Sequence, residues 1–498
     1  MKLKQLIKEI PSIKVKGSKD INITGLSVNS KIVAPGNLFI AKKGKSEDGA
    51  KYIPEAIAAG ANAILTDLYD PSLKNVVQVI HQNVGEVEGL LAAQYYQNPA
   101  NDLFMVGITG TNGKTTTAFI VKYLLDQFFG PCGLIGTIEY ILGSIRYQAT
   151  RTTPDVISNY KMLREMITQG CRSAVMEVTS HALDQGRVAH IDFDAAIFSN
   201  LTLDHLDYHQ TMENYCDAKN NLFRKLGTIP SKKKNPKIAI VNTDSPWTTK
   251  IIEGCKTKKI TYGIENNADL RASNVRLGKH GTELDLIYQG KTYPCQWPLI
   301  GRFNVYNCLS AMAVVISRGL PLEEIVEKMR GFPGVRGRLQ LVSNDLNLKI
   351  VVDYAHSDDA LMNILETLTE LKTGKIITVF GCGGDRDRSK RPKMGSVCQQ
   401  YSDYSIVTSD NPRTEDPKAI CDAILQGYKS KESVLVEIDR YKAIEKAIGM
   451  ATENDIILIA GKGHETYQIF SHKTIEFDDC KVANEICAKL ALIKCEKS

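Results

Sequence analysis

The sequence lacks the features that mark a membrane or exported protein. Within its 498 residues no apolar run approaches the length that spans a bilayer. The first ten residues, MKLKQLIKEI, carry an early lysine pair, but Lys8 and Glu9 interrupt any apolar signal segment. Both absences predict a protein without a membrane span that works in the cytoplasm.

The sequence also lacks the common metal and redox patterns. None of its 12 cysteines forms a CxxC pair, and HExxH does not occur, which excludes a zinc ribbon, a redox dithiol and a zincin site. His205 and His209 have HxxxH spacing, but no third ligand follows, so structural zinc is not expected. Cysteines scattered through a long chain without an export signal are expected to be free thiols in a reducing compartment.

Strong charge of either sign is missing too. The formal net charge is only +6, with 24% charged and 43% hydrophobic residues, a composition typical of a soluble globular protein. No stripe of basic and aromatic residues is present, so no nucleic-acid partner is expected. A mild positive charge suits small anionic substrates.

The length and the pattern of apolar runs predict an α/β protein of three domains, covering residues 1–102, 103–336 and 337–498. The first contains a strand (37–41), an amphipathic helix closed by Gly60 and a second strand (61–66). The segment YYQNPAND (95–102) has the composition of a linker. Alternating strands and helices are expected from Leu103 to about Arg336.

The last third contains four apolar strands that each run into a polar or glycine-rich segment. They lie within 349–356, 375–387, 404–413 and 455–465, with helical stretches between them. This alternation predicts a parallel sheet covered on both faces, whose ligands bind beyond the carboxyl ends of the strands. The polar residues expected at that edge are Asp353, His356, Asp385, Arg386, Asp410, Asn411, Arg413, His464 and Glu465.

The segment VGITGTNGKTTT (106–117) has the chemistry of a phosphate-binding loop between a strand and a helix. Backbone N–H groups and the helix N-terminus would face the anion, Lys114 would reach the outer phosphates, and Thr115 would contact Mg²⁺. The spacing departs from GxxxxGK[ST], because Ile108 stands where the first glycine is required. The strand before and the helix after it still favour a nucleotide site over a plain turn.

Several other polar residues admit a functional and a structural interpretation. Glu177 ends an apolar strand and can ligate Mg²⁺ as a hard oxygen donor, although a solvated glutamate is the commoner case. His205 or Asp204 can face the nucleotide-bound metal, whereas Lys219 would by default be an exposed helical lysine. Asn304 and Asn307 open an apolar helix and can act as simple caps.

Read together and in order, these segments resemble the Mur ligases. The resemblance runs from Ser30 to Glu465 and rests on GTNGKTT, EVTSHALDQGRV, NLTLDHLDYH with Lys219 downstream, GRFNVYN, GVRGRL, DYAHSDDAL, FGCGGDRDRSKRP, DNPR and GKGHE. It implies a UDP-sugar-binding domain, then an ATPase domain with a parallel sheet, then a Rossmann-like amino-acid domain. The implied reaction uses ATP to convert a glutamate carboxylate into an acyl phosphate, which the amine of an amino acid then attacks.

The resemblance assigns roles to the nucleotide and metal residues. Lys114 and Thr115 keep the phosphate and Mg²⁺ roles, Glu177 and His205 resemble ligands of two Mg²⁺ ions, and Lys219 matches a lysine carried as a carbamate. His356 lies beside the ATP-binding set. That set is Gly110, Thr111, Asn112, Gly113, Lys114, Thr115, Thr116, Asn304, Arg338 and Asp353.

It also assigns residues to the two other substrates, UDP-MurNAc-L-Ala-D-Glu and meso-diaminopimelate. The UDP-sugar contacts fall on Val28, Ser30, Ser46, Glu47, Asp48, Thr152, Thr153, Thr179, Gln185 and Arg187. The diaminopimelate contacts fall on Arg386, Asp410, Asn411, Pro412, Arg413, Gly461 and Glu465. Three positions depart from the family pattern: Arg151, Thr179, and Asp358, which replaces a proline and puts the local turn in doubt.

The charge of the amino-acid site favours diaminopimelate over L-lysine. Diaminopimelate carries a second carboxylate, and Arg413 offers a planar bidentate fork for it. Asp410 and Glu465 can hold the ammonium group of the same end. The alternatives are an L-lysine-adding Mur ligase, a folylpolyglutamate synthetase and, from another class, a nucleotide-dependent switch. A monomer is expected.

Overall fold

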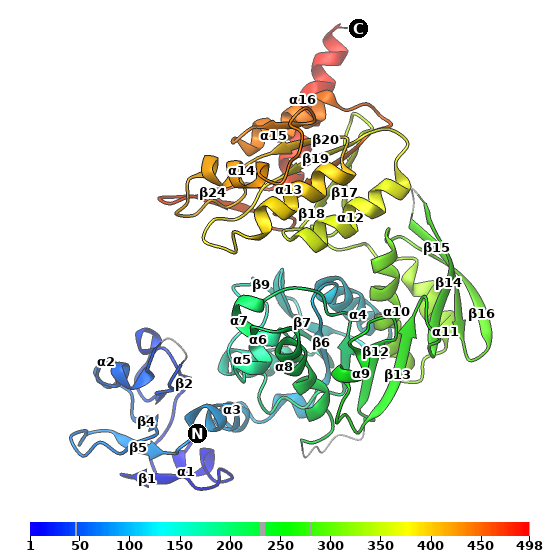
Figure 1. Ribbon diagram of the computed structural model, residues 1–498. Helices are drawn as coiled ribbons and strands as arrows, with labels where there is room; N and C mark the ends of the chain where they lie inside the picture. Colours follow the sequence, from blue (N-terminus) through cyan, green and yellow to red (C-terminus); the bar gives the residue numbers. More distant parts are fainter. Residues whose placement is uncertain (45–46, 230–234, 279–280, 498) are drawn as a thin grey trace. The chain divides into compact units, whose positions relative to one another are not determined.

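The computed structural model describes residues 1–44, 47–229, 235–278 and 281–497, with side chains up to residue 492 (Figure 1). The chain divides into two compact units. Unit 1 comprises Met1–Thr261 and Ser310–Gly319, and unit 2 comprises Tyr262–Leu309 and Leu320–Ser498. No helix in the described part of the chain is both long enough and apolar enough to cross a membrane.

The first sheet of unit 1 has the strand order β1-β5-β4-β3-β2, in which β1 is antiparallel to β5 and the other pairs are parallel. Its strands are β1 (Lys14–Lys16), β2 (Leu26–Ser27), β3 (Leu38–Ile40), β4 (Ala63–Thr66) and β5 (Val77–Ile80). The helices of this segment are α1 (Leu3–Leu6), α2 (Ile53–Ala58) and α3 (Val84–Tyr95). The predicted strand–helix–strand fragment is therefore confirmed, and Gly60 follows α2 with a φ of +99°, which favours glycine.

The second sheet of unit 1 contains a parallel core, β12-β11-β6-β10-β7, extended by the antiparallel strands β8 and β9. These strands are β6 (Phe104–Thr109), β7 (Cys132–Ile135), β8 (Glu139–Leu142), β9 (Ile145–Gln148), β10 (Ser173–Glu177), β11 (Ala195–Phe198) and β12 (Ile238–Asn242). The helices are α4 (Lys114–Phe129), α5 (Val156–Thr168), α6 (Ser180–Asp184), α7 (Leu206–His209), α8 (Met212–Lys225) and α9 (Thr248–Ile251). All six residues of β6 are buried, as expected for a central parallel strand.

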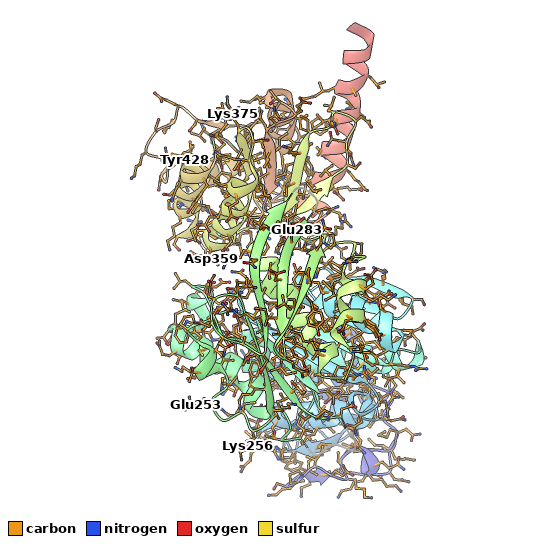
Figure 2. All side chains as sticks on the ribbon, turned by 90° about the vertical axis from the view of Figure 1, so that its right-hand side faces the viewer. Glu253, Lys256, Glu283, Asp359, Lys375 and Tyr428 are labelled. Carbon is orange, nitrogen blue, oxygen red and sulfur yellow. The ribbon has the colours of Figure 1, made fainter. Side chains whose placement is uncertain are left out.

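Between residues 262 and 300 the structure differs from the expected alternation of strands and helices. Strands β14 (Leu270–Gly278), β15 (Gly281–Tyr288) and β16 (Lys291–Trp297) form an antiparallel meander that pairs with the end of β13 (Lys258–Gly263). In β15 buried Leu284 alternates with exposed Glu283, which projects from the strand in Figure 2. Helices α10 (Arg302–Ile316) and α11 (Leu322–Met329) follow.

The second sheet of unit 2 has the order β17-β18-β22-β19-β20-β21. The four predicted strands lie in its centre and are parallel, as is β21, whereas the edge strand β17 is antiparallel to β18. The strands are β17 (Gln340–Val342), β18 (Lys349–Asp353), β19 (Ile376–Phe380), β20 (Tyr404–Val407), β21 (Val434–Val436) and β22 (Ile456–Ala460). Their carboxyl ends therefore share one edge, as the apolar runs predicted.

Helices cover both faces of this sheet (Figure 1). One core contains side chains of α12 (Asp358–Leu371), α13 (Lys390–Tyr401) and α14 (Pro417–Leu425) packed on alternate strand residues. The opposite core contains side chains of α15 (Arg440–Met450) and α16 (Asp479–Lys497). Burial on both faces explains why these strands are nearly continuous runs of Val, Ile and Leu.

A short hairpin stands beside the carboxyl edge of this sheet. Its strands β23 (Tyr467–Ile469) and β24 (Thr474–Glu476) pair with each other, and Phe470 at its turn pairs with Arg413 through an isolated parallel bridge. The hairpin thus touches the loop that follows β20.

Candidate active site

The loop between β6 and α4 requires two glycines. Gly113 has a φ of +85° at the N-terminus of α4, and Gly110 has a φ of +151°. A Cβ atom at Gly110 would lie 1.9 Å from Ser199 Oγ, so no larger residue fits. The backbone therefore wraps closely around the start of a sixteen-residue helix, which is a favourable position for an anion.

The carboxyl end of β11 supports this loop. Asn200 accepts from Thr111 N through its backbone oxygen (2.9 Å) and from Asn112 N through Oδ1 (2.9 Å). Ser199 Oγ donates to Asn112 O at 2.7 Å. Sequence reasoning did not single out Ser199 or Asn200, although a polar pair directly after an apolar strand was a usable signal.

Two lysines point at one carbonyl group of the loop. Lys114 Nζ donates to Gly110 O at 3.0 Å and to Thr111 O at 2.7 Å, and Lys219 Nζ donates to Gly110 O at 2.8 Å. Lys219 is only 1% exposed, so the default expectation of an exposed helical lysine is wrong. Burial, with the charge of Lys114 as a smaller cause, lowers the pKa of the Lys219 ammonium well below its usual value.

Glu177, at the end of β10, is fully buried rather than solvated. Its Oε2 accepts from Thr115 Oγ1 (2.9 Å) and Thr137 Oγ1 (3.0 Å), and its Oε1 accepts from Thr137 N (2.8 Å). Thr137 was missed, because it follows β7 in a segment without a recognisable pattern. A carboxylate beside a threonine hydroxyl at a phosphate-binding loop offers the hard oxygen donors that Mg²⁺ prefers.

His205 lies close to both lysines in an aromatic cluster. It has a φ of +55°, and burial, with smaller effects of Lys114 and Lys219, lowers its pKa. Its ring centroid lies 5.0 Å from that of His181, whose pKa burial lowers to about 4. Among the described residues no group of three His, Cys, Asp or Glu side chains is arranged to hold a metal.

Five of the expected UDP-sugar residues lie together in unit 1. Thr153 Oγ1 donates to Glu177 O (2.8 Å) and to Thr179 Oγ1 (3.3 Å), while Arg187 donates to Thr153 O (3.0 Å) and to Gln185 Oε1 (2.6 Å). Thr152 Oγ1 lies 3.1 Å from Thr137 Oγ1. Thr179 also caps α6 by accepting from Ala182 N, which a threonine does as well as the serine of the family pattern.

The other expected UDP-sugar residues lie around the first sheet. Val28 is 37% exposed, Ser30 Oγ donates to Glu55 Oε2 at 2.7 Å, Glu47 accepts from Tyr52 Oη at 2.8 Å, and Asp48 accepts from Ala50 N at 3.0 Å. Ser46 lies outside the described residues.

In unit 2, Asp353 fixes the turn that carries Arg338. Its Oδ2 accepts from Leu339 N and its Oδ1 from Ala355 N, both at 2.7 Å. Arg338 lies over the ring of Tyr354, with Cζ 4.8 Å from the ring centroid. Arg336, two residues before Arg338, forms a salt bridge with Asp478 at 2.6 Å.

Two further members of the predicted ATP-binding region have partners inside unit 2. Asn304 is buried and donates to Ile300 O at 2.8 Å, while Asn307 donates to Asn304 Oδ1 at 2.9 Å. His356 is exposed, with Nδ1 2.9 Å from Tyr354 O. Asp358 begins α12 directly after its cap Ser357, a position that accepts aspartate or proline, so the turn left in doubt is an ordinary helix start.

The expected diaminopimelate residues meet at the carboxyl edge of the sheet β17–β22 in unit 2. Arg413 has a φ of +53°, its N–H donates to Ile469 O at 3.0 Å, and its Nη1 donates to Gly384 O at 2.8 Å. Gly384 N donates to Asn411 O at 2.9 Å, which joins the loop of Arg386 to the Asn411–Pro412–Arg413 turn. Within the described residues, neither Arg413 nor Arg386 forms an ion pair with a carboxylate of the protein.

Asp410 and Glu465 are the acidic members of the expected set. Asp410 is buried, and its Oδ2 would lie 2.7 Å from a Cβ atom at Gly461, whose φ of +112° favours glycine. Glu465 Oε2 accepts from Asn411 Nδ2 at 2.7 Å. Burial raises the pKa of Glu465, opposed by the charge of Lys462.

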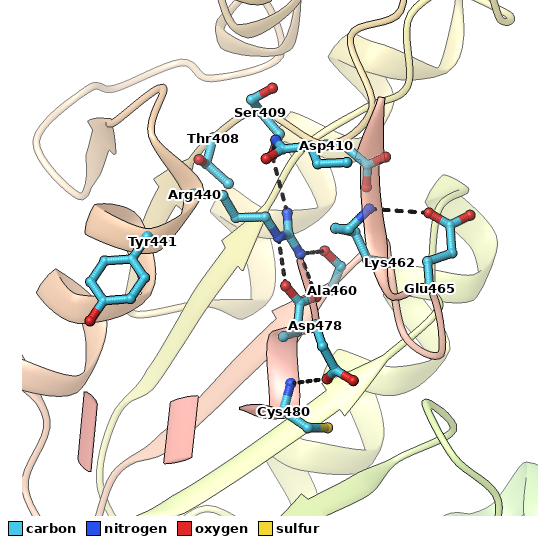
Figure 3. Close-up of polar contacts among 12 residues, drawn as sticks. Thr408, Ser409, Asp410, Arg440, Tyr441, Ala460, Lys462, Glu465, Asp478 and Cys480 are labelled. Carbon is cyan, nitrogen blue, oxygen red and sulfur yellow. Dashed lines mark hydrogen bonds and ion pairs between the residues drawn. The ribbon is translucent and has the colours of Figure 1, made fainter. Parts of the chain in front are cut away.

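A buried ion pair supports the two loops that carry these residues (Figure 3). Arg440 and Asp479 are fully buried and doubly hydrogen bonded at 2.8 Å, and Arg440 also donates to Ser409 O (3.4 Å) and Ala460 O (3.0 Å). Those carbonyls immediately precede Asp410 and Gly461. A second pair, Arg391 with Glu415, holds the loop of Gly383, since Arg391 also donates to Gly383 O.

These pairs and the buried Lys462 were missed by sequence reasoning. Lys462 left a signal, because it is a charged residue directly after an apolar strand. Arg440, Asp479 and Arg391 left none, since their ion-pair partners lie 24 or 39 positions away along the chain.

Three family models match the chain: "Mur ligase family, catalytic domain" over residues 22–96, "Mur ligase middle domain" over 108–315, and "Mur ligase, glutamate ligase domain" over 337–463. A UDP-N-acetylmuramoyl-L-alanyl-D-glutamate–2,6-diaminopimelate ligase of Chlamydia felis is 44% identical over 98% of this chain and 99% of its own. The protein of the same name from Listeria monocytogenes serotype 4b is 40% identical over 96% and 97%.

A solved structure of a ligase with that name has a TM-score of 0.70 and 31% identity, and the match covers 98% of this chain and 99% of the other. The matches to the family models and to these relatives together extend along nearly the whole chain.

Proposed function

Because the chain belongs to the Mur ligase family, we propose that it joins meso-diaminopimelate to the D-glutamate carboxylate of UDP-MurNAc-L-Ala-D-Glu. The reaction consumes ATP, releases ADP and phosphate, and builds a precursor of peptidoglycan. The names and the coverage of the relatives support this reaction. The observation that carries the choice of amino acid is Arg413, whose guanidinium bonds only to carbonyl oxygens among the described residues.

ATP is needed because a carboxylate is a poor electrophile. Transfer of the γ-phosphoryl group gives an acyl phosphate, the amine attacks its carbonyl carbon, and phosphate leaves from the tetrahedral intermediate. The N-terminus of α4 and the Lys114 ammonium bind and neutralise the phosphate oxygens during transfer. Thr111, Asn112 and Thr116 belong to the same loop and helix start.

The metal set is Thr115, Glu177, His205 and a carbamate on Lys219. Two Mg²⁺ ions held there would neutralise phosphate charge and orient the phosphoryl group. The buried Lys219, with its lowered pKa, supplies the neutral amine that combines with CO₂ and releases one proton to give an anionic oxygen donor. The buried Glu177–Thr115 pair supports this set.

We assign the remaining binding roles to three domains, with boundaries at residues 102/103 and 336/337. Asn304, Arg338 and Asp353, with His356 beside them, contribute to ATP binding. The UDP-sugar is held by two groups, Val28 to Asp48 and Thr152 to Arg187. The enzyme acts in the cytoplasm as a monomer.

The unreacted end of diaminopimelate is a zwitterion that matches the charges of unit 2. The Arg413 fork, with Arg386, binds its carboxylate in a bidentate manner, and Asp410 with Glu465 binds its ammonium group. L-lysine would leave the Arg413 charge without its partner, which is a costly mismatch in a partly buried site.

The test is phosphate release from ATP in the presence of UDP-MurNAc-L-Ala-D-Glu, with meso-diaminopimelate and L-lysine offered separately. We expect a strong preference for diaminopimelate that Arg413→Ala loses, whereas Arg330→Ala, which removes an exposed arginine of unit 2, retains it. Preference for L-lysine would overturn the role of Arg413 but retain the ligase. Turnover that needs neither amino acid, or that a protein partner stimulates, would overturn the ligase itself in favour of a nucleotide switch.

A further inference from the structure

Lys462 is a buried lysine at the carboxyl edge of the sheet β17–β22 in unit 2. The proposed reaction assigns it no role. Lys462 follows β22 and Gly461, and its side chain is 0% exposed. Its Nζ lies 3.2 Å from Glu465 Oε2, 3.3 Å from Asn411 Oδ1 and 5.6 Å from the ring centroid of Tyr467. Burial of an ammonium group is expensive unless polar partners compensate it.

Both polar partners of Lys462 are residues of the amino-acid site, and they are also bonded to each other. Asn411 Nδ2 donates to Glu465 Oε2 at 2.7 Å, and Asn411 Oδ1 accepts from Ile469 N at 2.9 Å as well as from Lys462. Both ends of the Asn411 side-chain amide are therefore hydrogen bonded within the protein. This orients Asn411 and leaves Glu465 as the member of the trio that is available to a ligand.

The Glu465 carboxylate is held through one oxygen only. Among the described residues its contacts with Asn411 and Lys462 are both at Oε2, and the side chain remains 15% exposed. A carboxylate fixed at Oε2 presents Oε1 in a set direction, which is the geometry that an ammonium group requires.

The charges around Glu465 make Lys462 necessary. Asp410 repels the Glu465 carboxylate, and burial disfavours its charged form, while Lys462 provides the favourable charge at hydrogen-bond distance. Arg440, Tyr354 and Tyr467 are the other titratable groups that sense Glu465, and Arg440 is already neutralised by Asp479. Among the described residues Lys462 is the cation at hydrogen-bond distance from Glu465, so its loss would leave the repulsion by Asp410 opposed only by more distant charge.

We propose that Lys462 is a positioning residue for amino-acid recognition: its buried ammonium group holds Glu465 and Asn411 so that Glu465 Oε1 binds the ammonium group of the incoming amino acid. Lys462 does not touch the substrate and acts through Glu465. This inference rests on the proposed function, because it concerns the same amino-acid site.

The test is a double-mutant cycle of Lys462→Met and Glu465→Gln, measured with whichever of meso-diaminopimelate and L-lysine the wild type uses better. We expect Lys462→Met to raise the KM for the amino acid about tenfold, the size of a lost hydrogen bond to a charged group, and to leave the KM for ATP within about twofold. The double variant should resemble Glu465→Gln within about twofold, because a residue that acts through Glu465 has no effect once that carboxylate is gone.

The pH profile separates positioning from general damage. Loss of Lys462 raises the pKa of Glu465 further, so a higher pH is needed to ionise this carboxylate. The amino-acid KM of Lys462→Met should therefore fall toward the wild-type value as the pH rises, whereas that of Glu465→Gln should not. Lys481→Met, which removes the exposed partner of Glu476 in the same unit, is the matched control and should behave as wild type.

Additive effects in the cycle, or equal increases in the KM for ATP and for the amino acid, would overturn the role of Lys462. If Lys462→Met fails to fold, Glu465→Gln can still be compared with the double variant. The double variant removes both charges of the pair and leaves neither buried without its partner, and equal KM values in the two proteins would support the role of Lys462. Preference of the wild type for L-lysine would overturn diaminopimelate specificity but leave the cycle valid. Turnover of neither amino acid would remove both proposals.

Discussion

Lys114 and Lys219 both donate to the carbonyl oxygen of Gly110, an arrangement that two full positive charges would disfavour. The conflict is relieved if Lys219 loses its proton, and burial lowers its pKa in that direction. A buried neutral amine is reactive toward CO₂, whereas Lys114 is partly exposed and belongs to the phosphate-binding loop. The surroundings of the two lysines therefore suit different roles.

At this scale we expect Lys219→Ala to lose activity on the order of a hundredfold or more, as when one preorganised polar group is removed from a transition state. Added formate or acetate should restore part of the activity by supplying the missing carboxylate. Steady-state phosphate release checks both, with Lys225→Ala on the exposed side of the same helix as the control. Full activity of Lys219→Ala without added carboxylate would refute the carbamate.

Individual residues also mark where sequence reasoning reached its limit. Lys114, Thr115 and Arg413 could be singled out because each lies in a recognisable motif that follows an apolar strand. Thr137, which bonds to Glu177 from 40 positions away, has no local pattern. Contacts of this kind depend on strand order, and β7 and β10 become neighbours only in the folded sheet.

At the scale of single elements, the strands of the last third were predictable because burial on both faces leaves a continuous apolar run. The meander β14 to β16 was not predicted, although in β15 the buried Leu284 and Leu286 alternate with the exposed Glu283 and the less buried Asp285. This period of two is the signal of a half-exposed strand, and the strand–helix alternation expected throughout residues 103–336 left it unused.

The start of α12 provides a prediction on element stability. Ser357 caps the helix by accepting from Ala360 N, so Ser357→Ala should lower the free energy of unfolding by about 0.5–2 kcal/mol. Asp358→Pro should change it by less than about 0.5 kcal/mol, because the lost charge–dipole attraction and the reduced entropy of the unfolded chain nearly cancel. Ser357 is already extended, as the residue before a proline requires.

Urea unfolding of the full chain measures both changes, with Thr369→Ala on the exposed side of α12 as the reference. A large loss of stability in Asp358→Pro would show that the aspartate does more at this helix start than provide a favourable charge.

At the scale of the whole molecule, the chain divides into two compact units, and the proposed amino-acid site lies entirely in unit 2. A ligand that binds the folded form of one unit stabilises that unit by mass action. In calorimetry of the intact protein, meso-diaminopimelate at about 100 times its Kd should raise the midpoint of the unit 2 transition by about 5 °C or more. The transition of unit 1 should stay where it is.

L-alanine at the same concentration should shift neither transition, and Arg413→Ala should abolish the shift with diaminopimelate. Equal shifts of both transitions would contradict a site confined to unit 2. Limited proteolysis followed by mass spectrometry would establish which transition belongs to which unit.

The buried pair of Arg440 and Asp479 also constrains how the sequence can change over generations. Replacing either partner alone leaves an unpaired charge buried beneath both substrate loops. This lowers the free energy of unfolding by on the order of 3–5 kcal/mol, which is a large part of a typical domain's stability. Replacing both by apolar residues removes that penalty. Single-step mutational routes away from this pair therefore pass through an unstable protein, and the two positions are expected to change together or not at all among descendants of this gene.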